Sequence, residues 1–411
     1  VCPSDLVGTD LTLIEEAIEC DANYSVRLKK EAIEITGLNN PNSAAQLKRW
    51  IGERIGHEVT SLTKERVPLL LEEADDPNVK RILELRQLMA KTSIKKYRTM
   101  QNARCKDGRV RGLLQFYGAN RTGRWAGRLV QVQNLPQNHL PDLDDARNLV
   151  RTGEFDEIEF LYDSIPDTLS QLIRTAFIPR EDNRFIVADF SAIEARVIAW
   201  LAGEKWRMEV FKTHGKIYEA SASKMFHVPI ESVKKGSDLR AKGKIAELAL
   251  GYGGASGALI AMDKNKSIPE DELPGLVSSW RKANSNITKF WWDCDKSAKK
   301  AITDRTTVCM QFGLKFIYDP GVLFIQLPSG RRLSYIRPKI EEGKFGKPVV
   351  TYEGMQQTTK QWTTLETYGP KIVENIVQAT ARDCLAEAMF KVEKAGYDIV
   401  MHVHDEIITD V

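Results

Sequence analysis

The sequence lacks the features that mark membrane, secreted and zinc-finger proteins. Its 411 residues contain no apolar run long enough to span a membrane and no signal peptide. The six cysteines are scattered, and no two have the spacing of zinc ligands. They indicate reduced thiols in a reducing compartment. The chain also has no internal repeat and no low-complexity segment.

The net charge is small, but the charges are unevenly distributed. A net charge of +3 does not by itself indicate a nucleic-acid partner. Residues 91–128, however, hold eleven basic side chains against one acid, Asp107, whereas residues 142–167 are strongly acidic. A solvated face would explain the basic segment, but so strong an imbalance favours contact with a phosphate backbone. The basic residues are Lys91, Lys95, Lys96, Arg98, Arg104, Lys106, Arg109, Arg111, Arg121, Arg124 and Arg128.

The length allows two to four domains or subdomains, and the apolar periodicity changes along the chain. Residues 1–115 are predicted to be mostly helical, with helices over Thr12–Ile33, over Ser43–Ile55 with Ser43 as the cap, and over Arg81–Met100. Strands at 184–189 and 399–411 enclose a helical block. They indicate an α+β fold with a mainly antiparallel catalytic sheet. Further helices are expected within 201–305, at 238–252 and at 370–395, and short strands at 306–340.

Two adjacent carboxylates, Asp405 and Glu406, lie at the tip of a predicted hairpin between apolar residues 399–401 and 407–408. Desolvating both is costly unless a cation neutralises them. Asp189 follows another apolar run, so we expect a metal site assembled from two distant strands. Two Mg²⁺ ions roughly 3.5–4 Å apart could there activate a 3′-hydroxyl and stabilise a leaving pyrophosphate. Ordinary turn residues are the alternative, and His402 with His404 gives only a weak zinc signal.

Four residues at every fourth position, Arg240, Lys244, Leu248 and Tyr252, share nearly one face of a predicted helix. A triphosphate needs cations, and a base and sugar need a flat apolar platform, so one such face could serve both. A solvated helix with a core tyrosine is the alternative. The glycines around Tyr252 favour a tight turn at the end of this helix.

Loop residues at the end of the basic segment can donate hydrogen bonds to any base pair. They are Arg124, in Thr122-Gly123-Arg124, and Gln133 and Asn134, which precede Leu135-Pro136. Arg, Gln and Asn can donate to minor-groove acceptors that every base pair presents. A reader of duplex DNA without sequence preference needs that property, although loop polarity alone would also explain these residues.

Taken in their order along the chain, these stretches resemble the motifs of family A DNA polymerases, the DNA polymerase I type. Residues 189–196 (Asp-Phe-Ser-Ala-Ile-Glu-Ala-Arg) resemble the first palm motif, 240–253 the fingers-helix motif, and 403–406 the second palm carboxylate motif. The resemblance extends from about residue 40 to the end, and the full set of motifs in order is specific. Other matching stretches are Thr122–Arg124, Gln133–Pro136, Ile173–Phe177, Gly330–Leu333 and Gln378–Asp383.

The resemblance implies a right-hand fold that adds deoxynucleotides to a primer on template DNA. It places the thumb and N-terminal helices in 1–115, the palm in 116–200 and 306–411, and the fingers in 201–305. The acidic segment 141–168 would be an insertion in the palm. Primer-template DNA and dNTPs would be the partners, with no membrane. The chain would act as a monomer in the cytoplasm of a bacterial cell or phage-infected host, with any processivity factor left open.

By the same resemblance, Asp189 and Asp405 hold two Mg²⁺ ions, for which Mn²⁺ can substitute. The Phe190 carbonyl would be a further ligand, and Glu406 would support the site. Lys244 would give a proton to the leaving pyrophosphate.

The resemblance also assigns nucleotide and DNA contacts. Arg240 and Lys244 would grip the triphosphate, and Glu194 would leave no room for a 2′-hydroxyl. The other expected nucleotide contacts come from Leu248, Tyr252 and Tyr218. The expected contacts with DNA come from Arg124, Gln133, Asn134, Gln378 and His404.

Some positions depart from the family pattern. Leu248 replaces an aromatic residue on the sugar platform, which leaves dideoxynucleotide use open and resembles phage-encoded members. Asn375 precedes Gln378 at a spacing one residue off, so Gln378 is the preferred contact. No segment resembles a 3′–5′ exonuclease, so no proofreading is expected. The chain also ends shortly after the hairpin, where we expect its relatives to continue.

Two other functions use the same residues. A catalytically silent DNA-binding relative would not need the full set of carboxylates and triphosphate cations. A metal-dependent nuclease could use the carboxylates, but it would have no evident use for the helix from Arg240 to Tyr252.

Overall fold

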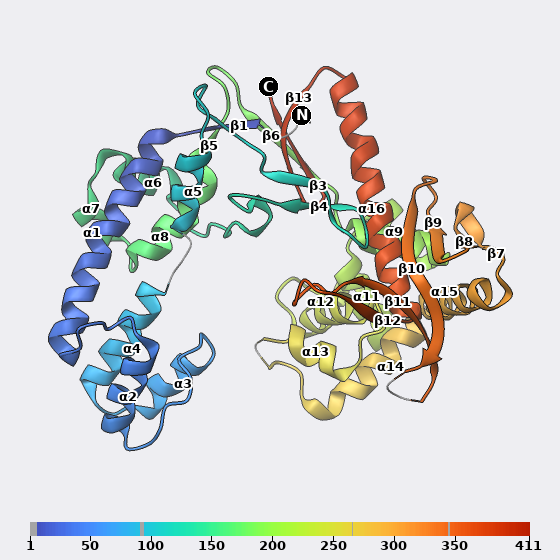
Figure 1. The fold of residues 1–411 in the computed structure, drawn as a ribbon, viewed down its shortest axis with the longest axis horizontal. Helices are drawn as coiled ribbons and strands as arrows, with labels where there is room; N and C mark the ends of the chain where they lie inside the picture. Colours follow the sequence, from blue (N-terminus) through green and yellow to red (C-terminus); the bar gives the residue numbers. More distant parts are fainter. Residues whose placement is uncertain (1–5, 91–93, 265, 344–345) are drawn as a thin grey trace.

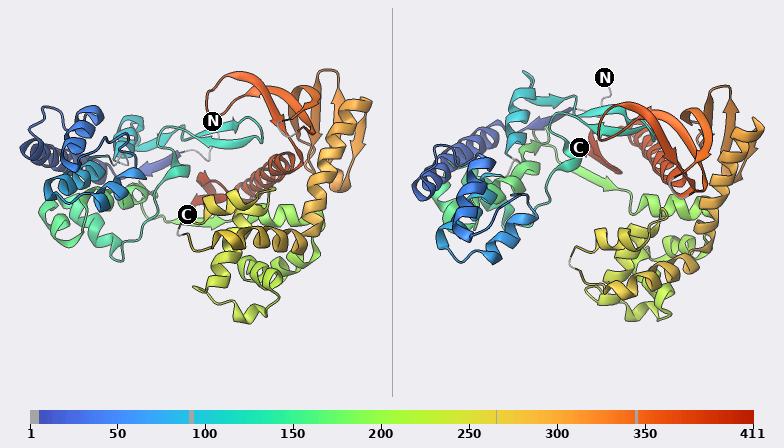
Figure 2. Two further views of the ribbon diagram at one scale, coloured as in Figure 1. Left: turned by 90° about the horizontal axis from the view of Figure 1, so that it is seen from below. Right: turned by 60° about the horizontal axis from the view of Figure 1, so that its bottom comes forward.

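The computed structural model describes residues 6–90, 94–264, 266–343 and 346–411. Two lobes are joined through a small central sheet, with α1–α8 in one lobe and α9–α15 in the other (Figure 1). Both lobes extend to the same side of this sheet, and two further views show the same division (Figure 2). The fold is α+β, as predicted, and its strand pairs are antiparallel.

The first lobe is mainly helical and contains the small sheet β2-β1-β5, while a second small sheet, β3-β4, lies between the lobes beside α16 (Figure 1). Its helices are α1 (Leu11–Thr36), α2 (Ala44–Ile55), α3 (Arg66–Glu73), α4 (Pro77–Met89), α5 (Lys95–Ala103), α6 (Leu143–Thr152), α7 (Phe155–Leu161) and α8 (Ile165–Leu172), with 3-10 turns η1 (Val132–Asn134) and η2 (Ile173–Ala176). Its strands are β1 (Leu6–Thr9), β2 (Arg109–Arg111) and β5 (Phe177–Ile178), and the sheet between the lobes consists of β3 (Leu114–Ala119) and β4 (Arg124–Gly127).

The second lobe combines a helical bundle with a six-stranded sheet, β12-β11-β10-β9-β8-β7. Its helices are α9 (Ile193–Ala202), α10 (Lys205–Thr213), α11 (Ile217–Phe226), α12 (Asp238–Leu250), α13 (Ser256–Met262), α14 (Leu273–Ala283), α15 (Ser285–Asp304) and α16 (Gly369–Lys394), with η3 (Ile230–Ser232), η4 (Glu270–Glu272) and η5 (Gln311–Gly313). Its strands are β7 (Thr307–Cys309), β8 (Lys315–Asp319), β9 (Val322–Gln326), β10 (Arg332–Glu342), β11 (Pro348–Met355) and β12 (Trp362–Thr367).

The central sheet has the order β13-β14-β6 and carries the predicted carboxylates. It consists of β6 (Phe185–Asp189), β13 (Asp398–Val403) and β14 (Glu406–Asp410), so the predicted hairpin is confirmed. Val400 and Met401 of β13 pack into the core of the first lobe. Ile399 and Ile407 pack against Leu385 of α16. The hairpin is therefore fixed from both sides by apolar contacts.

The predicted helix over Arg81–Met100 is wrong, because the chain forms two helices there. Helix α4 ends at Met89 and α5 begins at Lys95, while Lys91 lies outside the described residues. Leu83 packs into the core around α2 and α3, whereas Tyr97 and Met100 pack into the core around α1. The two halves of the apolar pattern thus belong to different cores, which periodicity along one chain cannot distinguish.

The helix cap predicted at Ser43 is confirmed. The Ser43 hydroxyl accepts a hydrogen bond from the Gln46 N–H and caps α2. The acidic segment forms α6–α8, and Ala146 and Val150 of α6 lie in the core that α6 shares with α1. The five cysteines in the described part of the chain are free thiols. No helix that the structure describes is both long and apolar enough to cross a membrane.

Candidate active site

One wall of the candidate site is built from the strands of the central sheet. We call Asp189, Asp405 and Glu406 the carboxylate wall. The register of β6 and β14 places Glu406 opposite Asp189, so the two side chains lie on the same face of the sheet. His404 adopts a left-handed conformation (φ 52°) in the turn between β13 and β14. The Phe190 N–H then donates to the Asp405 carbonyl at 3.1 Å, which joins the turn to the end of β6.

The surroundings of two residues of this wall, Asp405 and Glu406, disfavour negative charge. Burial raises the pKa of the Asp405 carboxyl, and Glu194 and Asp189 raise it further, while Arg124 opposes the rise. Burial and the charge of Asp189 likewise raise the pKa of Glu406. Both carboxylates would therefore gain from a nearby cation.

The opposite wall is provided by α12. We call Arg240, Lys244, Leu248 and Tyr252 the helix wall; Tyr252 lies just beyond the end of the helix. The Ser237 hydroxyl accepts from the Arg240 N–H at the start of α12, which fixes where the helix begins. Lys244 is exposed, and half of the Leu248 surface (52%) is accessible. The side chain that could meet a sugar is therefore open to the solvent.

A cleft of about 390 Å³ brings the two walls together. Its apolar lining includes Ile193, Ile198 and Ile217. Seven predicted site residues line it, namely Asp189, Phe190, Glu194, Tyr218, Leu248, Tyr252 and Asp405. Residues that are more than 200 positions apart in the sequence thus converge on one cleft.

A chain of hydrogen bonds connects the two walls. The Tyr252 hydroxyl donates to Glu194 at 2.8 Å, and burial together with the Glu194 charge holds the pKa of Tyr252 well above its usual value. Arg124 donates to the other oxygen of Glu194 at 2.8 Å and to Asp405 Oδ1 at 3.2 Å. Glu194 is therefore held from both sides by Tyr252 and Arg124. The position of Arg124 between two carboxylates is not evident from the sequence.

A second cavity of about 260 Å³ adjoins the cleft and shares Asp405 with it. It is lined by Arg124, Gln133 and His404, three of the predicted DNA contacts. In this structure the His404 Nε2 donates to the Gln133 carbonyl at 3.1 Å. The Gln133 side chain accepts from the Gly127 N–H and donates to the Trp125 carbonyl. These bonds fix the loop that carries Gln133.

Five predicted residues do not line either cavity. Arg240 lies beside the cleft, with its Nε 2.7 Å from Glu219 and its guanidinium over the ring of Tyr218. Glu406 pairs with Asp189 across the central sheet, and Lys244 is exposed on α12. Asn134 is exposed and Gln378 is half-buried on α16. By contrast, Asn375 is buried and donates to the Tyr335 hydroxyl, so it has a structural partner.

The residues fit a magnesium site better than a zinc site. Among the described residues, no three His, Cys, Asp or Glu side chains converge closely enough to hold a metal by themselves. His402 is buried, with only 1% of its surface exposed, and its Nδ1 has no hydrogen-bond partner. Mg²⁺ needs only one or two carboxylates when phosphate oxygens complete its shell. Asp189 and Asp405 line one cleft, and burial disfavours the charge of Asp405, which matches that requirement.

Sequence reasoning missed the residues at the base of the cleft. Arg207, Glu247 and Trp280 also line it, although they come from three different helices. One sequence feature could have indicated this cluster. It is a single acid, Glu247, between the apolar residues Ala246 and Leu250 on the buried side of α12.

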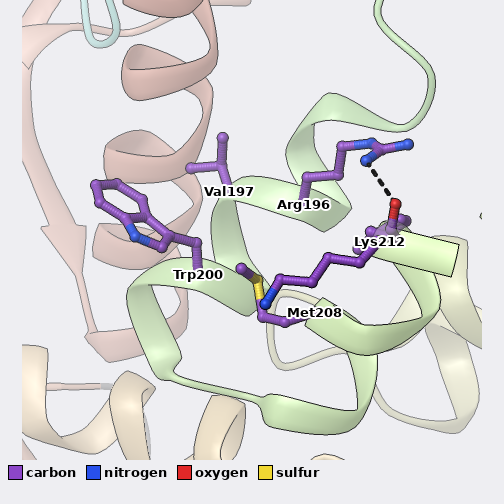
Figure 3. Close-up of a pocket in the computed structure, with 6 residues that line it drawn as sticks. Arg196, Val197, Trp200, Met208 and Lys212 are labelled. Atoms are coloured by element: carbon purple, nitrogen blue, oxygen red, sulfur yellow. Dashed lines mark hydrogen bonds between the residues drawn. The ribbon is translucent and has the colours of Figure 1, made fainter.

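Another pocket, of about 280 Å³, lies between α9 and α10 and contains none of the predicted site residues. It is mostly apolar, with Val197, Trp200 and Met208 in its wall (Figure 3). Arg196 reaches from α9 towards α10, where its guanidinium donates to the Phe211 carbonyl and lies over the Phe211 ring. The arginine thus fixes the end of α10 against α9.

Comparison with known proteins agrees with the fold and the motifs. The family model for DNA polymerase family A matches residues 14–411. A DNA polymerase of Bacillus phage SP02 is 60% identical over 407 residues, which cover 98% of this chain and 62% of that protein. DNA polymerase I of Lactococcus lactis subsp. lactis (strain IL1403) is 22% identical over 294 residues, or 69% of this chain and 28% of that protein.

Among solved structures, the POL domain of Pol1 from M. smegmatis, in complex with DNA primer-template and dNTP, superposes with a TM-score of 0.62. It is 20% identical in sequence, and the match covers 98% of this chain and 61% of that one. The chain thus spans about three fifths of the length of the SP02 polymerase. The architecture is the α+β polymerase fold, and the family match over almost all of the sequence shows that the chain belongs to DNA polymerase family A.

Proposed function

We propose that this chain is a DNA-directed DNA polymerase that adds deoxynucleotides to a primer 3′ end by two-metal nucleotidyl transfer. One observation carries the proposal: a single cleft has Asp189 and Asp405 on one wall and Leu248 and Tyr252 on the other. Such a cleft can hold a metal-bound triphosphate and its sugar at the same time. A nuclease would need only the carboxylate wall.

The carboxylate wall would hold the metals. Asp189, Asp405 and the Phe190 carbonyl would bind two Mg²⁺ ions, or Mn²⁺ in their place, which activate the 3′-hydroxyl and stabilise the leaving pyrophosphate. Glu406, opposite Asp189, adds negative charge that keeps cations in place. His404 and Arg124, which line the second cavity, would contact the primer end.

The helix wall would bind and orient the nucleotide. Arg240 and Lys244 lie one turn apart on α12 and would grip the triphosphate, with Lys244 giving a proton to the pyrophosphate. Tyr218, beneath the Arg240 guanidinium, would contact the phosphates. Leu248 supports the sugar, Tyr252 packs beside the nascent pair, and Glu194 excludes a 2′-hydroxyl. Gln133, Asn134 and Gln378 would contact the minor groove of the duplex.

The domain roles follow from the same assignment. Residues 1–115 would be the thumb, 116–200 and 306–411 the palm, and 201–305 the fingers. The partners would be primer-template DNA and dNTPs, handled by a monomer in the cytoplasm of a bacterial or phage-infected cell. The lack of proofreading stays a prediction that concerns these 411 residues alone.

An extension assay tests the function directly. The protein is incubated with a labelled primer on a longer template, Mg²⁺ and four dNTPs, in parallel with a sample in which a chelator removes the metal. We expect Mg²⁺-dependent extension. A mobility shift without extension would indicate a silent DNA-binding relative, and shortening of the primer would indicate a nuclease.

A further inference from the structure

The carboxylate of Glu247 is a hub that joins α12 to three other helices. Its side chain is 5% exposed. One oxygen accepts from Ser221 of α11 at 2.7 Å and from Trp280 of α14 at 3.0 Å. Arg207 of α10 donates to both oxygens, at 2.9 and 2.5 Å. Each of these directional bonds restricts where Glu247, and hence α12, can lie.

Arg207 is buried and makes its hydrogen bonds within this hub. Its side chain is only 2% exposed, and it donates further to the Asn284 side chain at 3.0 Å. The Nε of Arg207 has no hydrogen-bond partner. Burying such a pair adds little to stability compared with an apolar pair of similar volume, because desolvation offsets the attraction. The ion pair instead fixes how the Arg207 and Glu247 side chains are oriented relative to each other.

A second fixed point lies one turn earlier on the same face of α12. Gly243 packs so closely on α11 that a Cβ there would be 2.5 Å from the Tyr218 carbonyl oxygen. Gly243 and Glu247 together fix both the closeness and the rotation of α12. A rotation of about 20° would move a side-chain tip by roughly 2 Å, given the radius of a helix. Arg240, Lys244 and Leu248 would move by that amount.

The hub also connects α12, through α10, to α9 on the opposite side of the cleft. Arg196 holds α10 against α9 (Figure 3), and α10 presents Arg207 to Glu247. Helix α9 carries Glu194 and follows Asp189 in the chain. The path from α9 through α10 to α12 therefore places the triphosphate-binding side chains relative to the carboxylate wall.

We propose that Arg207 and Glu247 are positioning residues whose buried ion pair sets the rotation of α12 and thereby aims the nucleotide-binding side chains at the cleft. The inference rests on the proposed polymerase function for its kinetic consequence. Its structural consequence, an α12 held in one rotation, can be measured without catalysis.

The test compares three variants with the wild-type chain. Glu247→Gln keeps the size of the side chain and its acceptor oxygen but leaves Arg207 without a counter-charge. The double variant Arg207→Met/Glu247→Met replaces the pair by apolar side chains of similar length. Glu272→Gln is the matched control, because it weakens an ion pair that α12 makes through Lys242 with the more exposed Glu272. The readouts are hydrogen exchange of the α12 amides, thermal unfolding, primer-template affinity, and kcat and KM for a dNTP.

For Glu247→Gln we expect α12 amides to exchange about tenfold faster and the KM for dNTP to rise about tenfold. We expect kcat to change much less and DNA affinity to stay the same, because the carboxylate wall is intact. The double variant should keep a raised KM, and it should not gain stability, because Ser221 and Trp280 lose their acceptor together with Arg207. Glu272→Gln should resemble wild type.

Two results would overturn the inference. One is a double variant that regains the wild-type KM, since a merely structural pair would then suffice. The other is unchanged exchange and KM in Glu247→Gln. If the wild-type chain does not extend primers, the proposed function fails, and hydrogen exchange of α12 alone then decides whether the pair holds the helix.

Discussion

The two walls of the cleft are held in place by different kinds of interaction. The carboxylate wall is set by backbone: β6 and β14 pair residue by residue, and the Phe190 N–H binds the Asp405 carbonyl. The helix wall is set by side chains, through the Glu247 hub and the close contact at Gly243. Strand pairing tolerates changes of side chain, whereas a side-chain hub does not.

Because of this difference, we expect substitutions in the two walls to have two different kinds of effect. A substitution in the carboxylate wall should remove chemistry and leave the geometry of the site intact. A substitution behind the helix wall should leave the chemistry intact and misplace the nucleotide.

The largest effect is expected for Asp405→Ala. The variant removes a proposed metal ligand but not the backbone carbonyl that binds Phe190, so the sheet should persist. We expect extension to fall by about 10³-fold or more, with duplex affinity within several-fold of wild type. Rapid-quench extension and fluorescence anisotropy measure the two quantities.

Asp319→Ala, at the tip of the β8-β9 hairpin, is the matched control, because it removes an exposed carboxylate from another hairpin. It should extend primers normally. Full activity in Asp405→Ala would remove the basis for the proposed metal site.

An intermediate effect is expected from acid. His402 lies behind the carboxylate wall on β13, against Trp125, and burial, helped by the charge of Arg382, lowers its pKa to about 4. The unfolded chain, with the ordinary value of 6.5, binds the proton first. The contribution of His402 to the free energy of unfolding is therefore fully present above about pH 6.5. It falls by about 3 kcal/mol as the pH drops to 4.

Urea unfolding between pH 7 and 4 measures this loss, which His402→Phe should reduce and the exposed-site control His139→Phe should not. Equal pH slopes in wild type and His402→Phe would contradict the assignment. Acid should thus loosen the carboxylate wall before the helix wall.

The smallest effect is expected for Glu194→Ala, which cuts the hydrogen-bond chain between the walls. Tyr252 and Arg124 lose their shared acceptor, and space opens where a 2′-hydroxyl would lie. We expect discrimination against ribonucleotides to fall about tenfold, while neither wall moves. Competition between rNTP and dNTP measures the ratio, and Glu209→Ala, an exposed acid on α10, serves as the control. Unchanged selectivity would contradict the proposal that Glu194 excludes a 2′-hydroxyl.

Local parts of this structure could be predicted from sequence because their signals are local. The Ser43 cap, the α12 stripe from Arg240 to Leu248 and the hairpin around Asp405 each rest on a few neighbouring residues. The motif order then predicted that Asp189 and Asp405 would meet, although 216 positions separate them in the numbering.

The rest depends on contacts between distant residues for which no spacing rule exists. Arg124 reaches Glu194 across 70 positions and Asp405 across 281. Arg207 meets Glu247 across 40, and the apolar pattern of 81–100 divides between two cores. In each case the partner is chosen by tertiary packing, which periodicity does not contain.

The bridge that Arg124 makes between Glu194 and Asp405 bears on how the chain folds before the proposed metal ions bind. A buried acid without a counter-ion would delay folding until a cation arrived, as happens in small zinc domains. Here the chain supplies its own cation from a neighbouring strand. We therefore expect the chain to fold without metal ions, and a chelator to stop the proposed primer extension without unfolding the protein.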